Sequence, residues 1–323
     1  MSKRLILIDV MQGIAMFLVV LGHHLFSFMP KWYEHMFNWI YTFHMPLFIF
    51  ISGFLIRYSY KGMNSWAEYK PYIIKRIKKF VPPFLIVGAI CTLMTWDFND
   101  INALLTKLSY LFIAPRYSEV TFLWYIYTLF VFYCISPFIF NAKPWIKCII
   151  LILALYSSIQ IIPVRLFNID YISRYFIFFL AGAFVAKNYS RIKQYKKVIT
   201  STYTIILIVF VIMSIIFFTN DFNATQKYVM QWLGIPAFIC IAQLFKQWNN
   251  INKMFVWISV NCFGIYLLHM FFIQAGAMIV GRLPFSTPSW GYIAYLLVST
   301  AISIYASALL WKNVCKITIK KQQ

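Results

Sequence analysis

Long apolar segments recur along the chain, separated by short segments that carry most of the charge. Windows of roughly 17 to 22 apolar residues, the length that spans a bilayer, lie near 5–26, 37–56, 80–95, 121–141, 145–163, 171–187, 200–219, 229–246, 254–274 and 290–311. This pattern predicts an all-α, polytopic membrane bundle of about ten transmembrane helices, with a single domain over 1–323.

Composition and charge support this class of protein. Hydrophobic residues make up 62% of the chain and charged residues only 11%, whereas charged residues are about 25% of a soluble domain. The net charge of +21 is spread between apolar runs, so we expect no nucleic-acid partner. With a cytoplasmic N-terminus, 22 Lys and Arg residues lie inside and seven outside, as the positive-inside rule requires. We therefore predict that both termini are cytoplasmic.

Two segments between the windows differ from ordinary loops. Residues 63–80 mix aromatic and basic side chains, which favours a helix in the cytoplasmic interface. Residues 97–119 contain LLTKLSYLFIAP, which we interpret as an interfacial or re-entrant segment on the outer face. The six cysteines lack metal-ligand spacing, so we predict buried hydrophobic side chains and no metal site.

The first window, LILIDVMQGIAMFLVVLGHHL, carries Asp9, Gln12, His23 and His24. An ionisable residue at the centre of a membrane helix costs roughly 2.5 to 3.5 kcal/mol on insertion scales, so such residues are candidates for function. Asp9 lies near the cytoplasmic end of this window, where a catalytic role and a structural ion pair with the basic start of the third window are equally reasonable.

Three histidines are predicted to share one depth near the outer face. They are His23 in the first window, His44 in FHMPLFIFISGF and His269 in NCFGIYLLHMFF. A neutral imidazole can take a proton from a hydroxyl group, which makes histidine the usual general base for attack of an alcohol on a carbonyl. The alternative is a histidine that hydrogen-bonds a neighbouring helix, and for His24 or His44 alone this is the better interpretation.

Basic and aromatic residues mark two further candidate regions. Lys75, Arg76 and Lys78 enter the third window from the cytoplasm, where they suit an anionic, phosphate-bearing cofactor or simply lipid headgroups and topology. Trp124 and Tyr125 open the fourth window from outside, as an aromatic belt or as a surface that stacks on a sugar. Asp170 and Arg174, four residues apart, are expected to pair with each other.

Several of these stretches together resemble the acyltransferase family 3 membrane proteins, especially the fucose 4-O-acetylase-like branch. The stretch IDVMQGIAMFLVVLGHH is similar to the family signature at Asp9, Gly13, Ile14, Ala15 and His23. FHMPLFIFISGF (43–54), KRIKKFVPPF (75–84), FLWYIYTLF (122–130) and FGIYLLH (263–269) resemble its later motifs. The likeness spans residues 5 to 269. One position departs from it, because Gln12 stands where the family carries a basic residue eleven positions before the histidine.

The resemblance implies transfer of an acyl group, commonly acetyl from cytosolic acetyl-CoA, to a hydroxyl of a cell-surface or lipid-linked saccharide. It implies that His23 is the general base and that Asp9 and Gln12 belong to the catalytic motif. His44, Asn261, His269, Trp124 and Tyr125 are candidates for binding the acceptor, and Lys75, Arg76 and Lys78 for binding the CoA phosphates. Gln12 brings no charge, so it should stabilise an oxyanion less than Arg or Lys.

Two other functions stay open at this point. A saccharide or glycolipid transporter or flippase would line its path with the same intramembrane polar residues. A catalytically silent relative would have lost activity with the basic residue at position 12. In each case we expect a multi-pass protein of a cell membrane, that of a bacterium, with lipid around it and no permanently bound cofactor.

Overall fold

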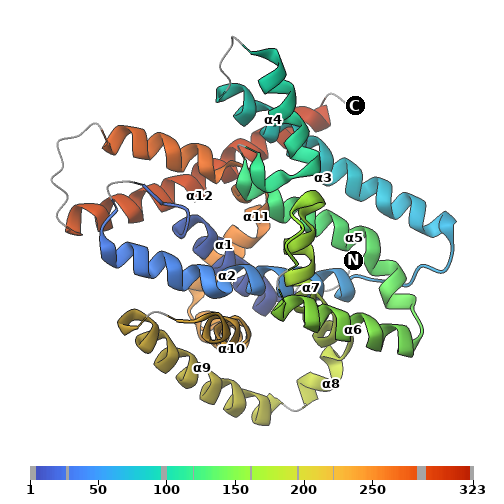
Figure 1. The fold of residues 1–323 in the computed structure, drawn as a ribbon. Helices are drawn as coiled ribbons and strands as arrows, with labels where there is room; N and C mark the ends of the chain where they lie inside the picture. The colour runs from blue at the N-terminus through green and yellow to red at the C-terminus, as the bar shows by residue number, and fades with distance from the viewer. Residues whose placement is uncertain are drawn as a thin grey trace. The chain divides into compact units, whose positions relative to one another are not determined.

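The computed structural model describes residues 5–26, 29–95, 100–118, 120–160, 162–194, 196–220, 222–281 and 289–320, and within them it contains helices and no β-strand (Figure 1). Lys3, Arg4, Arg282 and Lys321, which the charge count uses, and residues 97–99 and 119 of the predicted outer segment lie outside this part. The described chain forms two compact units, residues 1–51 with 189–323 and residues 52–188. The single domain over 1–323 stays a prediction.

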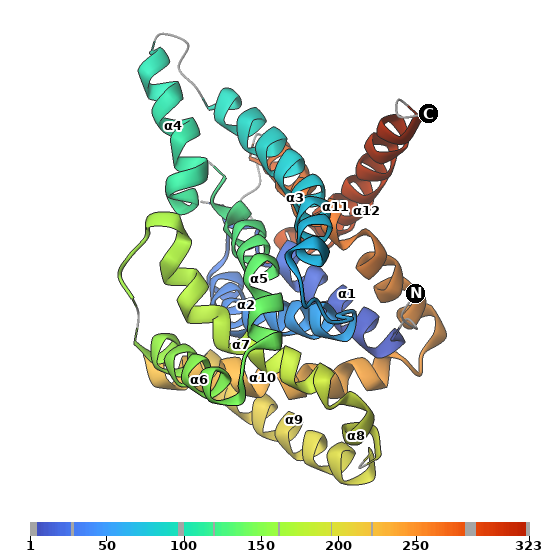
Figure 2. The ribbon, with the colours of Figure 1, turned by 90° about the vertical axis from the view of Figure 1, so that its right-hand side faces the viewer.

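The first unit is built around the N-terminal helix. It contains α1 (Ile6–Leu21), the first part of α2 (Lys31–Tyr58), α8 (Tyr189–Gln194), α9 (Lys196–Thr219), α10 (Ala224–Phe245), α11 (Asn249–Val280) and α12 (Ser289–Lys320). Helix α1 contacts α10, α11 and α12, and α9 packs along α10 (Figure 2). Val10, Met11, Ala15, Met16 and Val20 of α1 are therefore fully buried.

The second unit contains the end of α2 and the next eight elements. These are α3 (Trp66–Met94), α4 (Ile101–Ile113), η1 (Pro115–Tyr117), η2 (Thr121–Leu123), α5 (Trp124–Asn141), α6 (Pro144–Ile159), η3 (Leu166–Asn168) and α7 (Ile169–Lys187). Helix α3 contacts α4 and α5, and α6 packs on α7. Asp100 caps α4 by accepting from the N–H groups of Asn102 and Ala103 at 2.8 and 3.1 Å, which satisfies two otherwise unpaired donors.

The all-α, polytopic fold class is confirmed, because every predicted window coincides with a helix. Among the described residues, seven helices are long and apolar enough to cross a membrane: α2, α3, η2 with α5, η3 with α7, α10, α11 and α12. The windows near 5–26, 145–163 and 200–219 coincide with shorter apolar helices, Ile6–Leu21, Pro144–Ile159 and Thr204–Thr219. The count of ten spans and the N-in orientation stay predictions.

Segment 63–80 differs from the expectation of a separate interfacial helix. From Trp66 onward it is the first part of α3, which continues without a break through Pro71, Pro82 and Pro83 to Met94. A proline removes a backbone hydrogen bond but leaves φ within helical range, so neighbouring residues can keep the helix going.

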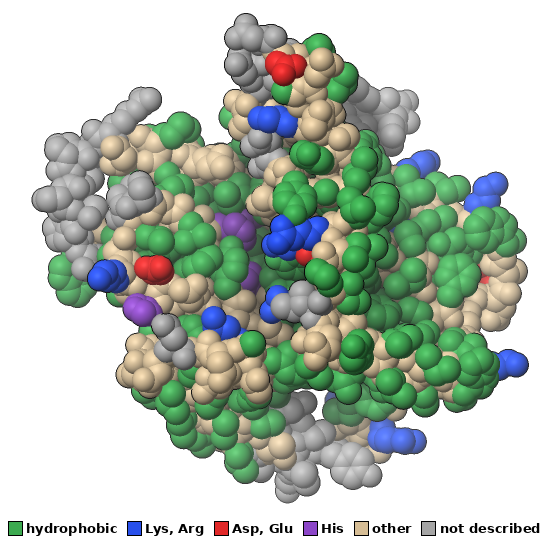
Figure 3. Space-filling model, viewed as in Figure 1, with side chains coloured by type: hydrophobic (Ala, Val, Ile, Leu, Met, Phe, Trp, Pro, Cys, Tyr) green, Lys and Arg blue, Asp and Glu red, His purple; other side chains and the backbone are tan. Residues whose placement is uncertain are grey.

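Hydrophobic side chains cover much of the surface, as expected for helices that face lipid. Figure 3 shows green side chains over most of the described part of one face, with few basic or acidic groups among them. On α6, for example, Ile152 is 66% exposed and Leu153 60% exposed. A surface of this kind is stable against lipid hydrocarbon and not against water.

Candidate active site

Helices α1 and α11 approach each other so closely that only glycine fits at their contact. A Cβ atom on Gly13 would lie 2.1 Å from the backbone oxygen of Phe255, well inside van der Waals contact. Small residues at membrane helix interfaces allow such close packing of backbones. The glycine of the signature in the first window therefore has a packing role: it seats α1 on α11.

Gln12 also faces α11. Its Oε1 accepts a hydrogen bond from Ser259 Oγ at 2.9 Å, and its side chain is half-buried. With Oε1 fixed in this way, the amide N–H groups of Gln12 are the part of the side chain left to contact a ligand. Position 12 can thus supply uncharged N–H hydrogen-bond donors, but it holds no positive charge.

His23 lies two residues beyond the end of α1, and its ring is held in one orientation. Nδ1 donates to the backbone oxygen of Val19 at 2.5 Å. A carbonyl oxygen only accepts, so in the neutral ring Nδ1 carries the proton and Nε2 carries the lone pair. The eleven residues from Gln12 to His23 correspond to about three helical turns, which places both near one face of α1 and about 16 Å apart.

His44 on α2 and His269 on α11 have the same arrangement. Nδ1 of His44 faces the oxygen of Ile40 at 2.8 Å, and Nδ1 of His269 faces the oxygen of Tyr266 at 2.8 Å. Both side chains are buried, with exposures of 2% and 0%. As in His23, the backbone carbonyl fixes the tautomer that keeps the lone pair on Nε2.

The structure brings these three histidines together around a tyrosine. The rings of His23 and His269 have centroids 5.0 Å apart, and the ring of Tyr41 lies 6.1 Å from His23 and 4.6 Å from His44. We call these four residues the histidine cluster. Tyr41 was missed at the sequence level, although its position three residues before His44 places it about one helical turn away, on a neighbouring part of the same surface.

Contacts along α1 and α11 show that the two helices run in the same direction. Gly13 meets Phe255 and Gln12 bonds Ser259, while His23, just beyond the end of α1, meets His269 farther along α11. The predicted topology gives the first and ninth spans the same direction, in agreement with this pairing. The signature on α1 and the late motif on α11 therefore supply one continuous surface.

His24 has a structural role. It is fully buried, and its Nε2 lies 3.1 Å from Ser299 Oγ on α12. The hydroxyl of Tyr292 donates to the backbone oxygen of His24 at 2.8 Å, and Tyr33 on α2 accepts from its N–H at 3.1 Å. These bonds tie the end of α1 to α2 and α12, which is the packing interpretation of this histidine.

Asp9 and Asn261 lie away from the histidine cluster. Asp9 is in the first turn of α1, where a carboxylate interacts favourably with the helix dipole. Asn261 donates from Nδ2 to the oxygen of Trp257 on its own helix at 2.8 Å. It precedes His269 by eight residues, about 12 Å along α11, so the structure does not bring it to the three histidines.

Trp124 and Tyr125 belong to the second unit and have different surroundings. Trp124 is half-buried, and its ring packs against Tyr171 at 4.3 Å and Tyr175 at 5.4 Å. Tyr125 is 4% exposed, and its hydroxyl lies 2.8 Å from Ser52 Oγ. The Tyr125 ring is thus a packing element in this structure, and only Trp124 belongs to an aromatic stack that reaches the surface.

The basic residues of α3 are also in the second unit. Lys75 and Lys78 are exposed, whereas Arg76 is half-buried with its guanidinium 4.3 Å from the Tyr133 ring and 4.9 Å from the Tyr72 ring. Stacking on aromatic faces is typical of a guanidinium that is held in place. The two lysines are the groups more open to an anionic ligand.

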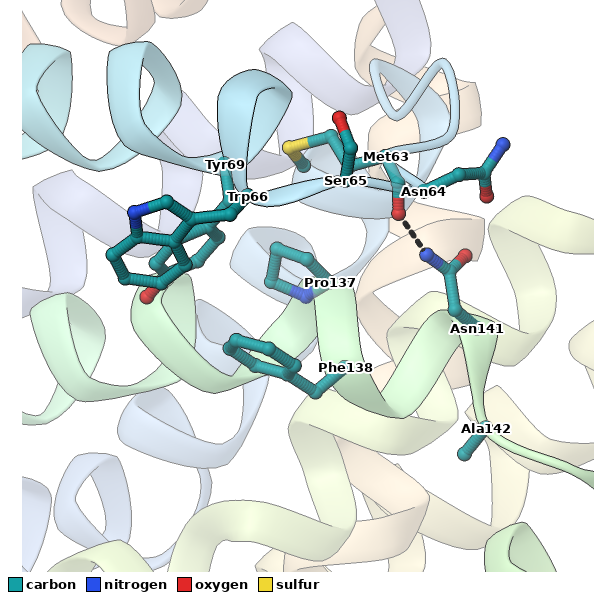
Figure 4. A pocket seen from close by; sticks show the side chains of 9 residues that line it. All are labelled: Met63, Asn64, Ser65, Trp66, Tyr69, Pro137, Phe138, Asn141 and Ala142. Atoms are coloured by element: carbon teal, nitrogen blue, oxygen red, sulfur yellow. Dashed lines mark hydrogen bonds between the residues drawn. The ribbon is translucent and has the colours of Figure 1, made fainter.

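A cavity of about 390 Å³ lies at the start of α3 (Figure 4) and had no signal in the sequence. Trp66, Tyr69 and Phe138 line it, and the Tyr69 ring centroid lies 5.1 Å from that of Trp66 and 5.0 Å from that of Phe138. Asn141 closes one side, because its Nδ2 donates to the backbone oxygen of Met63. These aromatic walls suit a flat ring system.

The ion pair of Asp170 differs from the expectation. Its Oδ2 accepts from Arg116 Nη1 at 2.8 Å, and within the described residues Arg174 makes no ion pair with it. The prediction that Asp170 pairs with Arg174 was therefore wrong. Arg116 is 54 positions away in sequence. As part of η1 it lies within ion-pair distance of the Asp170 carboxylate, which therefore pairs with Arg116 and not with Arg174.

Comparisons with known proteins identify the family of the chain. The family model described as an acyltransferase domain, that of acyltransferase family 3, matches residues 5–310. The chain is also 25% identical over 275 residues, 77% of this chain and 73% of the relative, to the Bacillus subtilis (strain 168) protein named "Putative membrane-bound acyltransferase YfiQ". No solved structure gives a significant match. The chain is a multi-pass membrane protein, and it belongs to acyltransferase family 3.

Proposed function

We propose that the protein moves an acyl group, acetyl in the simplest case, from cytosolic acyl-CoA to a hydroxyl of a saccharide or glycolipid at a cell membrane. The observation that carries this proposal is the histidine cluster, in which His23 keeps its Nε2 lone pair beside His269. Family membership supports acyl transfer as the reaction class. Donor, acceptor and residue roles are inferred from the chemistry of the site.

His23 is the general base in this proposal. Its Nε2 takes the proton of the acceptor hydroxyl while the hydroxyl oxygen attacks the thioester carbonyl carbon. The carbon–sulfur bond then breaks, the CoA thiolate leaves and is protonated, and an ester and free CoA are formed. His44 and His269, when neutral, orient the acceptor through Nε2. Gln12 lies about 16 Å from His23 along α1, so its amide N–H groups are too far away to contact the thioester oxygen in this step and can contact only a more distant part of the donor.

The cytoplasmic part of the proposal concerns the second unit. Lys75 and Lys78 are exposed charges that can contact CoA phosphates, with Arg76 beside them on α3. The aromatic cavity of Figure 4 begins at Trp66, nine residues before Lys75 on the same helix. Nine residues correspond to about 13 Å, a separation that an extended nucleotide can bridge. We therefore assign this cavity to the adenine ring of the donor.

The deciding experiment measures release of CoA thiol by purified protein given acetyl-CoA, with and without a panel of saccharide acceptors. Wild type is compared with His23→Ala and with His35→Ala, which removes an exposed histidine of α2. Acceptor-dependent release that survives in His35→Ala and disappears in His23→Ala supports both the reaction and the base. Equal release by all three proteins contradicts the role of His23.

A catalytically silent relative is the second candidate, and Gln12 is the observation that favours it. A variant Gln12→Lys separates the two. An active enzyme adapted to Gln12 loses activity or changes little, because the lysine breaks the bond to Ser259. A silent protein gains CoA release when the positive charge is restored.

A further inference from the structure

Three arginines meet at an open cavity in the second unit. The cavity has a volume of about 620 Å³, and its lining includes Arg116, Arg165, Arg174, Asp170, Tyr117 and Tyr171. These side chains come from η1, from the turn before η3 and from the start of α7. We call this region the arginine cavity. The proposed function above gives it no role.

The positive charge of the arginine cavity is only partly balanced. Asp170, 8% exposed, uses Oδ2 for Arg116 at 2.8 Å and Oδ1 for the backbone N–H of Tyr171 at 2.9 Å. Arg165 donates instead to the Tyr117 hydroxyl, and Arg174 lies 5.7 Å from the Tyr175 ring. Neither has a carboxylate partner within the part of the chain that the structure describes. One carboxylate thus faces three guanidinium groups.

Two tyrosine rings, Tyr117 and Tyr171, line the arginine cavity, and Tyr175 and Trp124 pack against Tyr171 outside the lining. Arg116 lies 4.1 Å from the Tyr171 ring, which stacks on Tyr175 at 5.6 Å and packs against Trp124 at 4.3 Å. An arginine on an aromatic face is held in place and keeps its outer N–H groups for a ligand. Stacked aromatic rings beside such donors present an apolar face next to a charge.

The backbone under the cavity is held in an uncommon conformation. Phe167 and Asn168 have φ values of 54° and 60°, in the left-handed region that non-glycine residues seldom adopt. Asn168 is fully buried and is fixed by bonds from Nδ2 to Thr128 Oγ1 at 2.7 Å and to the Trp124 oxygen at 3.1 Å. Strained backbone of this kind persists where its surroundings hold it, often at ligand sites.

We propose that the arginine cavity binds an oxyanion, a phosphate or carboxylate, carried by the saccharide acceptor. Guanidinium groups bind both oxyanions through paired N–H donors, and the exposed ring of Tyr117 in the lining suits the apolar face of a sugar ring. The predicted topology places Arg116, Arg165 and Arg174 on the outer side, where the acceptor hydroxyl is expected. This inference rests on the proposed function, since it names the class of that reaction's acceptor.

The test is a binding titration without acyl donor, by ligand-detected NMR, on the full chain in phosphatidylcholine nanodiscs. The probes are glucose 1-phosphate, glucuronate, neutral methyl glucoside and inorganic phosphate. The variants are Arg165→Gln and Arg174→Gln, and the matched control is Lys227→Gln, which removes an exposed cation of α10 on the predicted outer side. We expect at least one anionic sugar to bind tenfold tighter than methyl glucoside, and each arginine variant to lose most of that preference.

Four outcomes overturn the proposal. The first is that charged and neutral sugars bind equally or not at all. The second is that Lys227→Gln loses as much of the preference for anionic sugars as the arginine variants do. The third is that inorganic phosphate binds as tightly as the charged sugars. The fourth is loss of sugar binding when phosphatidylglycerol replaces phosphatidylcholine, which identifies a lipid headgroup as the ligand. The titration contains no acyl donor, so failure of acyl transfer leaves its result readable. Conversely, if CoA release is equal with neutral and anionic acceptors, the proposed acyl transfer stands and the oxyanion-binding role of the arginine cavity is contradicted.

Discussion

His23 and His24 are neighbours with the same side chain, yet they differ in burial and in the partner of the bonded ring nitrogen. His23 bonds the oxygen of Val19 on α1 through Nδ1, and its ring lies 5.0 Å from that of His269 in the histidine cluster. His24 is fully buried, and its Nε2 and backbone groups are used by α2 and α12. The comparison shows that residue type alone does not identify a base. Each ring has one nitrogen without a hydrogen bond among the described residues, but that of His24, Nδ1, is fully buried, whereas His23 is half-buried within the histidine cluster and can meet a ligand.

Removal of His23 should produce the largest change in activity. His23→Ala loses the proton acceptor, and general base catalysis contributes about 100- to 10,000-fold, so we expect CoA release to fall by at least 100-fold. The thermal midpoint in detergent should stay within a few degrees of wild type, because the ring is half-buried and bonds only its own helix. His35→Ala is the control. Activity within tenfold of wild type would exclude His23 as the base.

His24→Ala should give the opposite pattern. The substitution removes a buried ring and leaves Ser299 without this partner, at a cost of about 3 kcal/mol in the free energy of unfolding. Thermal unfolding in detergent measures this loss. We expect the fraction that remains folded to release CoA at the wild-type rate per molecule. A loss of rate as large as that of His23→Ala, with normal stability, would make His24 a member of the reacting group.

Gly13→Ala tests whether the histidine cluster depends on the close packing of α1 against α11. The new methyl group would meet a backbone oxygen at 2.1 Å, so the helices must separate, at a cost of about 2 kcal/mol. Both unfolding temperature and CoA release should fall, because His23 moves away from His269. Gly276→Ala is the matched control, since its methyl group would meet side chains and no backbone, Ser299 Oγ at 3.2 Å and Tyr295 at 3.7 Å. Equal effects of the two substitutions would remove the special role of Gly13.

Much of the fold could be predicted from apolar periodicity, because each window of about 20 apolar residues has to satisfy its backbone bonds within a helix. The meeting of His23, His44 and His269 also followed from depth, since each lies near the same end of its span. The boundary between segment 63–80 and the third window could not be predicted. Basic and apolar residues alike are compatible with one continuous α3, so the change in polarity marks a change of environment and not a break in the helix.

The partners of individual side chains could not be predicted, because they depend on contacts between distant segments. The Arg116–Asp170 pair joins residues 54 positions apart and displaces the local pairing with Arg174 that helix spacing favours. The bond between Gln12 and Ser259 spans 247 positions. Local rules such as the i to i+4 pairing describe an isolated helix, and tertiary packing decides which partner is nearer.

Ser259→Ala should have the smallest effect. It tests whether a residue that only holds another motif side chain in position differs from one that takes part in the reaction. Hydrogen bonds between membrane helices average about 0.6 kcal/mol, which corresponds to about threefold in rate if the bond only orients Gln12. We expect kcat for CoA release to fall about threefold, with little change in KM for the acceptor. Ser303→Ala is the control, because that hydroxyl is fully buried and makes no hydrogen bond within the described residues. A fall as large as that of His23→Ala would place Ser259 among the reacting groups, and no change in kcat would show that Gln12 needs no orientation from α11.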